Sequence, residues 1–176
     1  MANKEALRDL QTRLAERLSA ARGQARSDAW LAVESEGRGF LLPLTQAGEI
    51  FAPTAIVPVA HAKPWFLGVT NLRGGLHGVV DLARFLGIQH AGPSADAGRV
   101  RTQLVAFNAA LDINCALLVD RLAGLRGAEQ LSIEPDTEQS RPSFVGGRFR
   151  DAAGRLWQEI LLSELAHHDA FLRIVG

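Results

Sequence analysis

Two apolar runs flank a short polar segment in PWFLGVTNLRGGLHGVVDLARFLG, residues 64–87. The runs Pro64 to Val69 and Leu76 to Leu82 have the composition of buried strands. The segment between them, Asn71 to Gly75, is typical of a turn, because asparagine and paired glycines tolerate the positive φ angles that tight turns need. We therefore predict a strand, a turn and a second strand.

The predicted turn directs two side chains, Leu72 and Arg73, into solvent. A guanidinium held on a rigid turn is placed to grip a carboxylate of another protein with two parallel hydrogen bonds. Such a group suits docking rather than catalysis. The alternative for Arg73 is an ion pair within its own domain, and Glu49 is a candidate for that internal partner.

Composition limits the classes of function. The chain has 176 residues, enough for one domain or for two small lobes that share a core, and its 19 basic residues balance 19 acidic ones. This balance gives no sign of a nucleic-acid partner. The N-terminus lacks the apolar core of a signal peptide, and no run approaches the length of a membrane span, so we expect a cytoplasmic protein without membrane insertion. The single cysteine, Cys115, lies in an apolar run and is expected to be a buried, reduced thiol.

The first 27 residues have a helical pattern. Apolar side chains recur at spacings of three and four residues, and the stripe comprises Leu7, Leu10, Leu14 and Leu18. A lone helix of this length is marginal in water, so the stripe needs a surface to cover. That surface belongs either to the same chain or to a partner, and the sequence leaves both open.

From residue 28 onward the pattern is that of short strands, which predicts a mostly β body. The expected strands are 30–33, 40–44, 56–59, 64–69, 76–80, 101–107 and 113–119. Glycine-rich turns at 36–39 and 151–154 predict two hairpins, the second joining 144–150 to 155–161. The composition of residues 91–98 predicts a flexible loop between two halves of the domain. The pattern of residues 162–172 predicts a short C-terminal helix.

No pattern of catalytic or metal-binding residues is present, and no cofactor is implied. The sequence lacks a nucleophile elbow, a phosphate-binding loop and a dinucleotide fingerprint. The five histidines are His61, His77, His90, His167 and His168, and their spacing does not indicate a zinc site.

Other chemically distinctive residues have structural interpretations. Asp81 and Asp120 each follow an apolar strand and are expected to cap the turn that comes next. The arginines at 141, 148, 150 and 155 are expected to be solvated on the late hairpin. The three tryptophans are expected to anchor the core, although a partly exposed Trp65 beside the Arg73 turn would suit an interface hot spot.

The motifs resemble a known family. GVTNLRG at 68–74, VVDLARFLG at 79–87 and INCALLVDRLAGLRGAEQLSIEP at 113–135 are similar to the signature of CheW-type chemotaxis adaptor domains, and Glu49-Ile50 resembles the family's EI segment. Among these adaptors, the KPWFLG segment, the N-terminal extension and the closing FLRI most resemble those of type IV pilus chemosensory systems. The similarity covers roughly residues 28–172.

The resemblance implies a fold with a specific plan. It predicts an all-β, CheW-like domain at 28–176, with two SH3-like five-stranded β-barrel lobes around a shared core. An N-terminal amphipathic helix and linker at 1–27 precede the domain, and a short C-terminal helix closes it. The loop near 91–98 would separate the two motif-bearing halves.

It also implies a function. The chain would be a noncatalytic adaptor that couples a chemoreceptor's cytoplasmic tip to the regulatory domain of a CheA-type histidine kinase at membrane receptor arrays, with twitching by type IV pili as the output. Glu49 and Arg73 match positions of partner contact, and Asn71, Leu72 and Gly74 shape the turn. Residues 75–78 depart from the family's apolar pattern. The alternative is a small-ligand or nucleic-acid-binding β-barrel.

Overall fold

The computed structural model describes residues 29–88, 102–135 and 140–176, and most of its regular structure is β. The strands are β1 (Ala29–Ser35), β2 (Arg38–Pro43), β3 (Ala47–Phe51), β4 (Phe66–Leu72), β5 (Gly75–Asp81), β6 (Gln103–Phe107), β7 (Cys115–Val119), β8 (Arg121–Gly127), β9 (Leu131–Glu134), β10 (Val145–Asp151) and β11 (Leu156–Ile160). The short helices are α2 (Leu82–Phe85), α3 (Leu162–Leu165) and α4 (Asp169–Leu172), with 3-10 turns η1 (Ala109–Leu111) and η2 (Ala128–Gln130). The helix expected at 1–27 and the loop at 91–98 lie outside the described residues.

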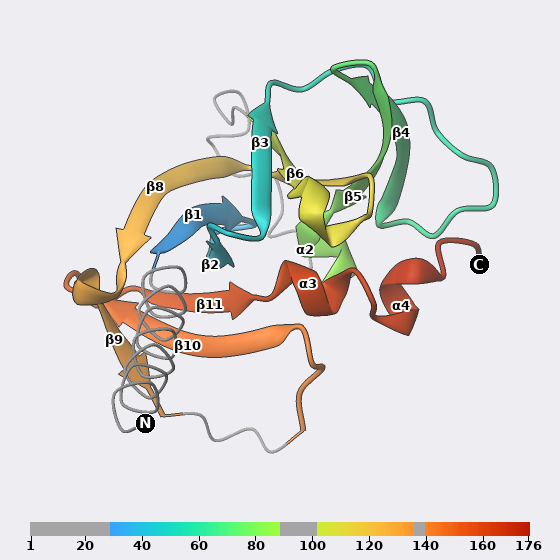
Figure 1. Cartoon of the computed structure of the whole chain (residues 1–176). Coiled ribbons are helices and arrows are strands. Elements are labelled where there is room, and N and C mark those ends of the chain that lie inside the picture. The colour runs from blue at the N-terminus through green and yellow to red at the C-terminus, as the bar shows by residue number, and fades with distance from the viewer. Residues whose placement is uncertain (1–28, 89–101, 136–139) are drawn as a thin grey trace, which may run out of the picture.

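The strands form two sheets, each of which curls into a lobe (Figure 1). The first lobe has six strands in the order β8-β1-β2-β11-β10-β9, and the second has five in the order β3-β6-β7-β5-β4. The mostly β, two-lobed fold is confirmed, but five strands is wrong for the first lobe, because η2 links β8 and β9 and both join that sheet.

One lobe is inserted into the other along the chain. The chain leaves the first lobe after β2, builds the whole second lobe with β3 to β7, and returns to the first at β8. The strands before and after residues 91–98, β5 and β6, therefore lie in the same sheet. The lobes are divided at residues 44–46 and at Asp120 instead.

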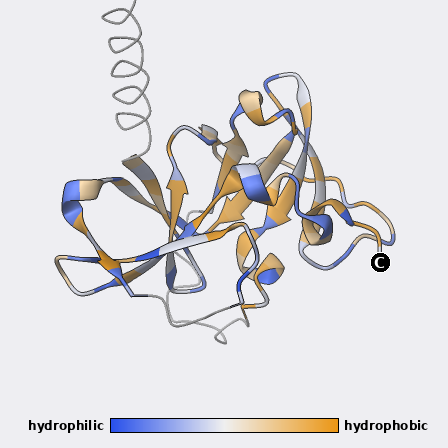
Figure 2. Cartoon of the chain, turned by 60° about the horizontal axis from the view of Figure 1, so that its bottom comes forward, coloured by the Kyte–Doolittle hydropathy of each residue, from blue (hydrophilic) through white to orange (hydrophobic). Residues whose placement is uncertain are grey.

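The central strands are buried on both faces. In β1, Leu31 and Val33 face a core shared by the lobes, while Trp30 and Ala32 face the interior of the first lobe. The same alternation holds in β6, where Val105 enters the shared core and its neighbours enter the second lobe. Figure 2 shows hydrophobic residues gathered toward the middle of the molecule. Such two-sided burial explains the nearly continuous apolar runs of the sequence.

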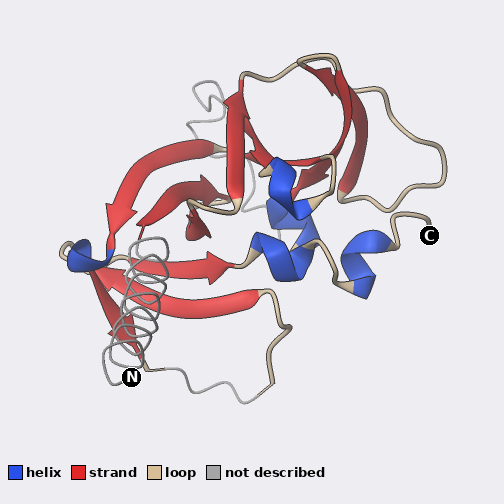
Figure 3. Cartoon of the chain, in the orientation of Figure 1, coloured by secondary structure: helices blue, strands red, loops and turns tan. Residues whose placement is uncertain are grey.

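The C-terminal segment closes the shared core. Instead of the single helix expected at 162–172, α3 and α4 are separate, because His168 has an extended backbone (φ −78°, ψ 126°) between them. This break lets Leu165 and Phe171 both enter the core. Phe171 stacks on Trp65 and Phe107, with ring centroids 6.1 and 5.9 Å away. The three short α-helices thus gather beside the second lobe (Figure 3).

The two aspartates that follow apolar strands act differently. Asp81 caps α2 as expected, since its Oδ1 accepts a hydrogen bond from the Arg84 N–H at 3.0 Å. Asp120 is followed directly by strand β8 and not by the turn that was expected. Its Oδ2 instead accepts from the Glu36 N–H at 2.6 Å and holds the β1–β2 turn, so that prediction is wrong.

The expected strand at 56–59 is only an isolated bridge. Val57 and Val69 exchange backbone hydrogen bonds of 2.8 and 2.9 Å, and Thr54 and Thr70 meet through their hydroxyls at 2.7 Å. Residues 54–57 therefore cover the outer edge of β4. Covering an edge protects it from pairing with another chain.

Residues 54–57 approach the backbone of β4 most closely at Gly68, and this close approach provides a test of the packing. The φ of Gly68 is +136°, and a Cβ there would collide with the Val57 carbonyl. We expect Gly68→Ala to destabilise the fold by more than about 2 kcal/mol, since strain and backbone overlap add. Gly154→Ala is the matched control: φ is +83° with open space around it, so a loss of about 1 kcal/mol is expected. Urea unfolding measures both, and equal losses would contradict the close contact.

Candidate docking surface

The β4–β5 hairpin ends in a two-residue turn made by Arg73 and Gly74. Both have positive φ, 49° and 84°, and Leu72 pairs with Gly75 on either side. This is the pattern of a type I′ turn, whose twist matches that of the flanking strands. The side chain of Asn71 reinforces it, because its Oδ1 accepts a hydrogen bond from the Gly74 N–H at 2.8 Å. The turn predicted from the sequence is confirmed and is shorter than expected.

Arg73 is a poor conformational choice for its position. The left-handed region costs a residue with a Cβ about 1–2 kcal/mol, and type I′ turns favour asparagine there. Strain of this kind is often found where the side chain has a task beyond folding.

The Arg73 side chain meets Glu49. Its Nη2 lies 2.5 Å from Glu49 Oε1, yet 75% of the Arg73 side chain and 43% of the Glu49 side chain remain exposed. Glu49 lies on β3 and Arg73 follows β4, the two outer strands of the five-stranded sheet, so the pair links the sheet's edges. The internal ion pair left open by the sequence is formed, and it is formed at the surface.

Exposed apolar side chains accompany this pair. Ile50, next to Glu49, is 38% exposed, and Leu76, two residues after Gly74, is 63% exposed. Leu76 is the cross-strand partner of Asn71, which is also exposed. We call Glu49, Ile50, Asn71, Arg73, Gly74 and Leu76 the Arg73 surface. It combines a charged pair with neighbouring apolar area, as protein interfaces do.

Two sequence expectations about this surface are wrong. Leu72 does not face solvent: it is 3% exposed and packs inside the second lobe with Val79 and Leu104, because the two-residue turn keeps it within β4. The alternative role for Trp65 beside the turn is also wrong, since Trp65 precedes β4, which spans about 20 Å, while its main expectation as a core anchor agrees with its packing. It is partly buried, packs edge-on against Phe85 at 5.0 Å and lies against the shared core.

The exposure of Leu76 was not predicted, although the sequence pattern around the turn indicates it. In a two-residue hairpin closed by Arg73 and Gly74, Asn71 stands opposite Leu76 on the same face of the sheet. A polar partner at the hairpin tip thus indicates that Leu76 faces outward. The leucine stripe at Leu7, Leu10, Leu14 and Leu18 lies outside the described residues and stays a prediction.

The arginines of the late hairpin do not form a free basic array. Arg150 Nε lies 2.6 Å from Glu134 Oε1, and this hydrogen bond lowers the pKa of Glu134. Arg155 Nη1 lies 2.5 Å from Glu34 Oε1, and Arg121 binds the other Glu34 oxygen at 2.6 Å. Burial alone would raise the pKa of Glu34, but the two guanidinium groups outweigh this effect and hold the pKa of Glu34 below its usual range. These pairs join β9 to β10, and they join β1 to β8 and to the β10–β11 hairpin.

The described residues offer little to hold a metal ion. Within 29–88, 102–135 and 140–176, no three His, Cys, Asp or Glu side chains gather in a suitable group. His167 and His168 diverge: His167 Nδ1 lies 2.8 Å from the Ser163 carbonyl, while the His168 ring packs edge-on against Phe144 at 4.8 Å. In the same part of the chain, no helix is long and apolar enough to cross a bilayer.

Cys115 is 5% exposed and lies in the shared core, as expected of a buried thiol. Burial raises the pKa of this thiol to about 12, against the smaller opposing effect of a hydrogen bond to the Ala116 carbonyl. The thiolate is the reactive form, so the group is inert at neutral pH.

This burial predicts how the thiol reacts. Since its pKa is raised to about 12, the thiolate becomes abundant only as the pH approaches that value. We expect a disulfide reagent such as 5,5′-dithiobis(2-nitrobenzoate) to label the folded protein at least about a hundredfold more slowly than the protein in guanidinium chloride at pH 8. Absorbance of the released thiol gives both rates. Similar rates would show that Cys115 is accessible in the native state.

Comparison with known proteins places this geometry in a family. The family model described as "CheW-like domain" matches residues 29–170. The chain belongs to the CheW-like domain family. It is also 30% identical over 168 residues to Protein PilI of Pseudomonas aeruginosa, a match that covers 92% of this chain and 88% of that protein. The resemblance inferred from the motifs is thereby confirmed.

The fold agrees with a solved structure of the same family. The scaffolding protein TtCheW from Thermoanaerobacter tengcongensis superposes with a TM-score of 0.60, at 18% identity, over 76% of this chain and 84% of that chain. The two-lobed architecture is therefore that of CheW. Together with the family match, this identifies a CheW-like adaptor domain of chemosensory signalling.

The strain at Arg73 in this CheW-like chain leads to a stability test. Asparagine is a better residue for this turn position, and an exposed ion pair contributes only about 0–1 kcal/mol. We therefore expect Arg73→Asn to leave the free energy of unfolding unchanged or raise it by about 0.5 kcal/mol. Urea denaturation decides the sign. A loss of more than about 1 kcal/mol would mean that the Arg73–Glu49 pair is a main support of the fold.

Proposed function

We propose that this chain is a noncatalytic adaptor that couples the cytoplasmic tip of a chemoreceptor to the regulatory domain of a CheA-type histidine kinase. Its output is control of twitching by type IV pili, and it works in the cytoplasm at membrane receptor arrays. The supporting observation is the exposed Arg73–Glu49 pair on a strained hairpin tip. Its setting is a CheW-like domain that matches PilI over 92% of the chain.

Each residue of the Arg73 surface has a role in this proposal. Arg73 receives a partner carboxylate, since the described residues give it no bond besides that to Glu49 and a guanidinium has five N–H donors. Glu49 orients the guanidinium, and Asn71 with Gly74 maintains the turn. Leu76 and Ile50 supply apolar contact, while Leu72 anchors the hairpin from below.

Binding measurements with charge variants test this proposal. Isothermal titration of the full chain against the kinase's regulatory domain, and separately against a receptor-tip fragment, should show binding to both. We expect Arg73→Glu to weaken one of the two by at least about tenfold, because a charged hot-spot contact exceeds about 1.4 kcal/mol. Arg173→Glu is the control, because Arg173 is equally exposed (76%) and follows Phe171, which stacks on Trp65 before the start of β4, whereas Arg73 follows the end of that strand.

A double variant separates docking from internal pairing. Glu49→Arg combined with Arg73→Glu rebuilds the ion pair with reversed polarity. If Arg73 binds a partner carboxylate, the double variant stays weak, whereas wild-type affinity would mean that the pair acts only within this chain. Unchanged binding by Arg73→Glu would remove Arg73 from the interface, and no binding of either partner by the wild-type chain would overturn the adaptor function itself.

A further inference from the structure

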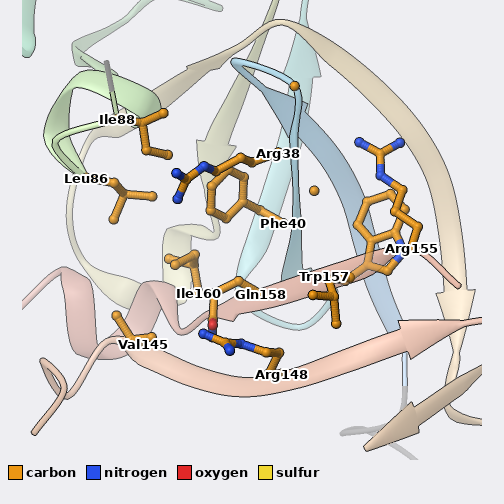
Figure 4. A pocket seen from close by; sticks show the side chains of 13 residues that line it. Arg38, Phe40, Leu86, Ile88, Val145, Arg148, Arg155, Trp157, Gln158 and Ile160 are labelled. Atoms are coloured by element: carbon orange, nitrogen blue, oxygen red, sulfur yellow. The ribbon is translucent and has the colours of Figure 1, made fainter. Parts of the chain in front are cut away.

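A cleft lies away from the Arg73 surface, on the first lobe (Figure 4). Its volume is about 700 Å³. Strands β2, β11 and β10 form its floor, where Phe40, Gln158 and Arg148 are paired across neighbouring strands. Leu86 and Ile88, which follow α2 of the second lobe, form one wall. The cleft therefore lies where the two lobes meet.

The cleft combines an apolar lining with positive charge. Its apolar side chains come from both lobes and comprise Phe40, Leu86, Ile88, Val145, Leu156, Trp157 and Ile160. Three arginines line it, and among its described lining residues there is no aspartate or glutamate. Small-ligand sites have this composition, an apolar lining with a few convergent polar groups, and volumes of about 300–1,000 Å³.

The three arginines are not equivalent. Arg155 is paired with Glu34, and its guanidinium lies 4.7 Å from the centre of the Trp157 ring. Arg38 and Arg148 have no side-chain hydrogen bond or ion pair within the described residues, and Figure 4 shows them on two sides of the cleft. Glu134, the cross-strand neighbour of Arg148, forms its hydrogen bond with Arg150, and the charge of Arg148 contributes only a smaller part of the lowering of the Glu134 pKa.

We propose that this cleft binds a small organic anion with an apolar body, such as an aromatic or medium-chain acid, whose anionic group is held by Arg38 and Arg148. The charge complementarity defines the ligand, because the cleft places the guanidinium groups of Arg38 and Arg148 beside apolar side chains, with no carboxylate among its described lining residues. A guanidinium offers paired N–H donors that match a carboxylate or sulfonate. This ligand site is separate from the proposed docking function and would give the adaptor a chemical input of its own.

Two dyes that differ by one charged group test the proposal. 8-Anilinonaphthalene-1-sulfonate carries an anion on an aromatic body, and N-phenyl-1-naphthylamine has the same rings without the sulfonate. We expect the full chain to bind the anionic dye saturably at one site and the neutral dye at least about tenfold more weakly, since hydrogen bonds to a charged group contribute about 1.5–3 kcal/mol. Added salt should weaken only the anionic dye.

Variants assign the binding to the cleft. Arg38→Gln combined with Arg148→Gln should lower affinity for the anionic dye by at least about tenfold and leave the neutral dye within about twofold. Arg173→Gln, which removes an exposed arginine elsewhere, should change neither. Thermal unfolding of each variant checks that the fold is intact. In a competition, octanoate should displace the anionic dye and octanol should not.

Each other outcome counts against the proposal. Equal affinity for the two dyes would show an apolar site without anion recognition. Anionic binding that survives the double substitution would place the dye elsewhere. Absence of saturable binding would mean that the cleft does not take up small anions in solution. Displacement by an acidic peptide but not by octanoate would make the cleft a peptide site.

Discussion

Burial of the central strands on both faces is the constraint on which the rest of this structure depends. Residues of β1, β2, β6 and β7 alternate between a lobe interior and the shared core, as Leu31 and Ala32 do in β1. No face of these strands is left for solvent, so a shift of register by one residue would exchange two cores of different shape. The relative position of the lobes is therefore set by packing inside each strand rather than by a linker.

This arrangement determines where exposed features can occur. Strand ends, outer strands and turns are the positions that two-sided burial leaves free, and the Arg73 surface uses all three. Its ion pair joins β3 to the β4–β5 turn, the two margins of the second sheet. The cleft lies elsewhere, where β2, β10 and β11 of the first lobe meet Leu86 and Ile88, which follow α2 of the second lobe.

The sequence predicted what local chemistry controls and missed what tertiary packing controls. Positive φ at Gly74 and the Asn71 side chain belong to the turn itself, so the hairpin could be read directly. Strands β3, β8 and β9 have exposed or half-exposed residues and lack long apolar runs, so they were not foreseen. The burial of Leu72 depends on the register across β4 and β5, and the position of Trp65 depends on α4, which lies a hundred residues further along the chain.

The local energetics of Arg73 explain how such a residue can persist at the hairpin tip. Its left-handed backbone lowers the free energy of unfolding by about 1–2 kcal/mol, and the exposed pair with Glu49 raises it by at most about 1 kcal/mol. The net effect of Arg73 on folding is therefore small. The pair nevertheless restricts a long side chain before any partner arrives. Ordering such a side chain at an interface costs about 0.5–1.5 kcal/mol, and Glu49 removes part of that cost in advance. A lysine at this position would keep the charge but lose the planar fork, whereas an asparagine would relieve the turn and remove the charge. In the proposed interface, arginine beside glutamate therefore favours recognition over turn stability.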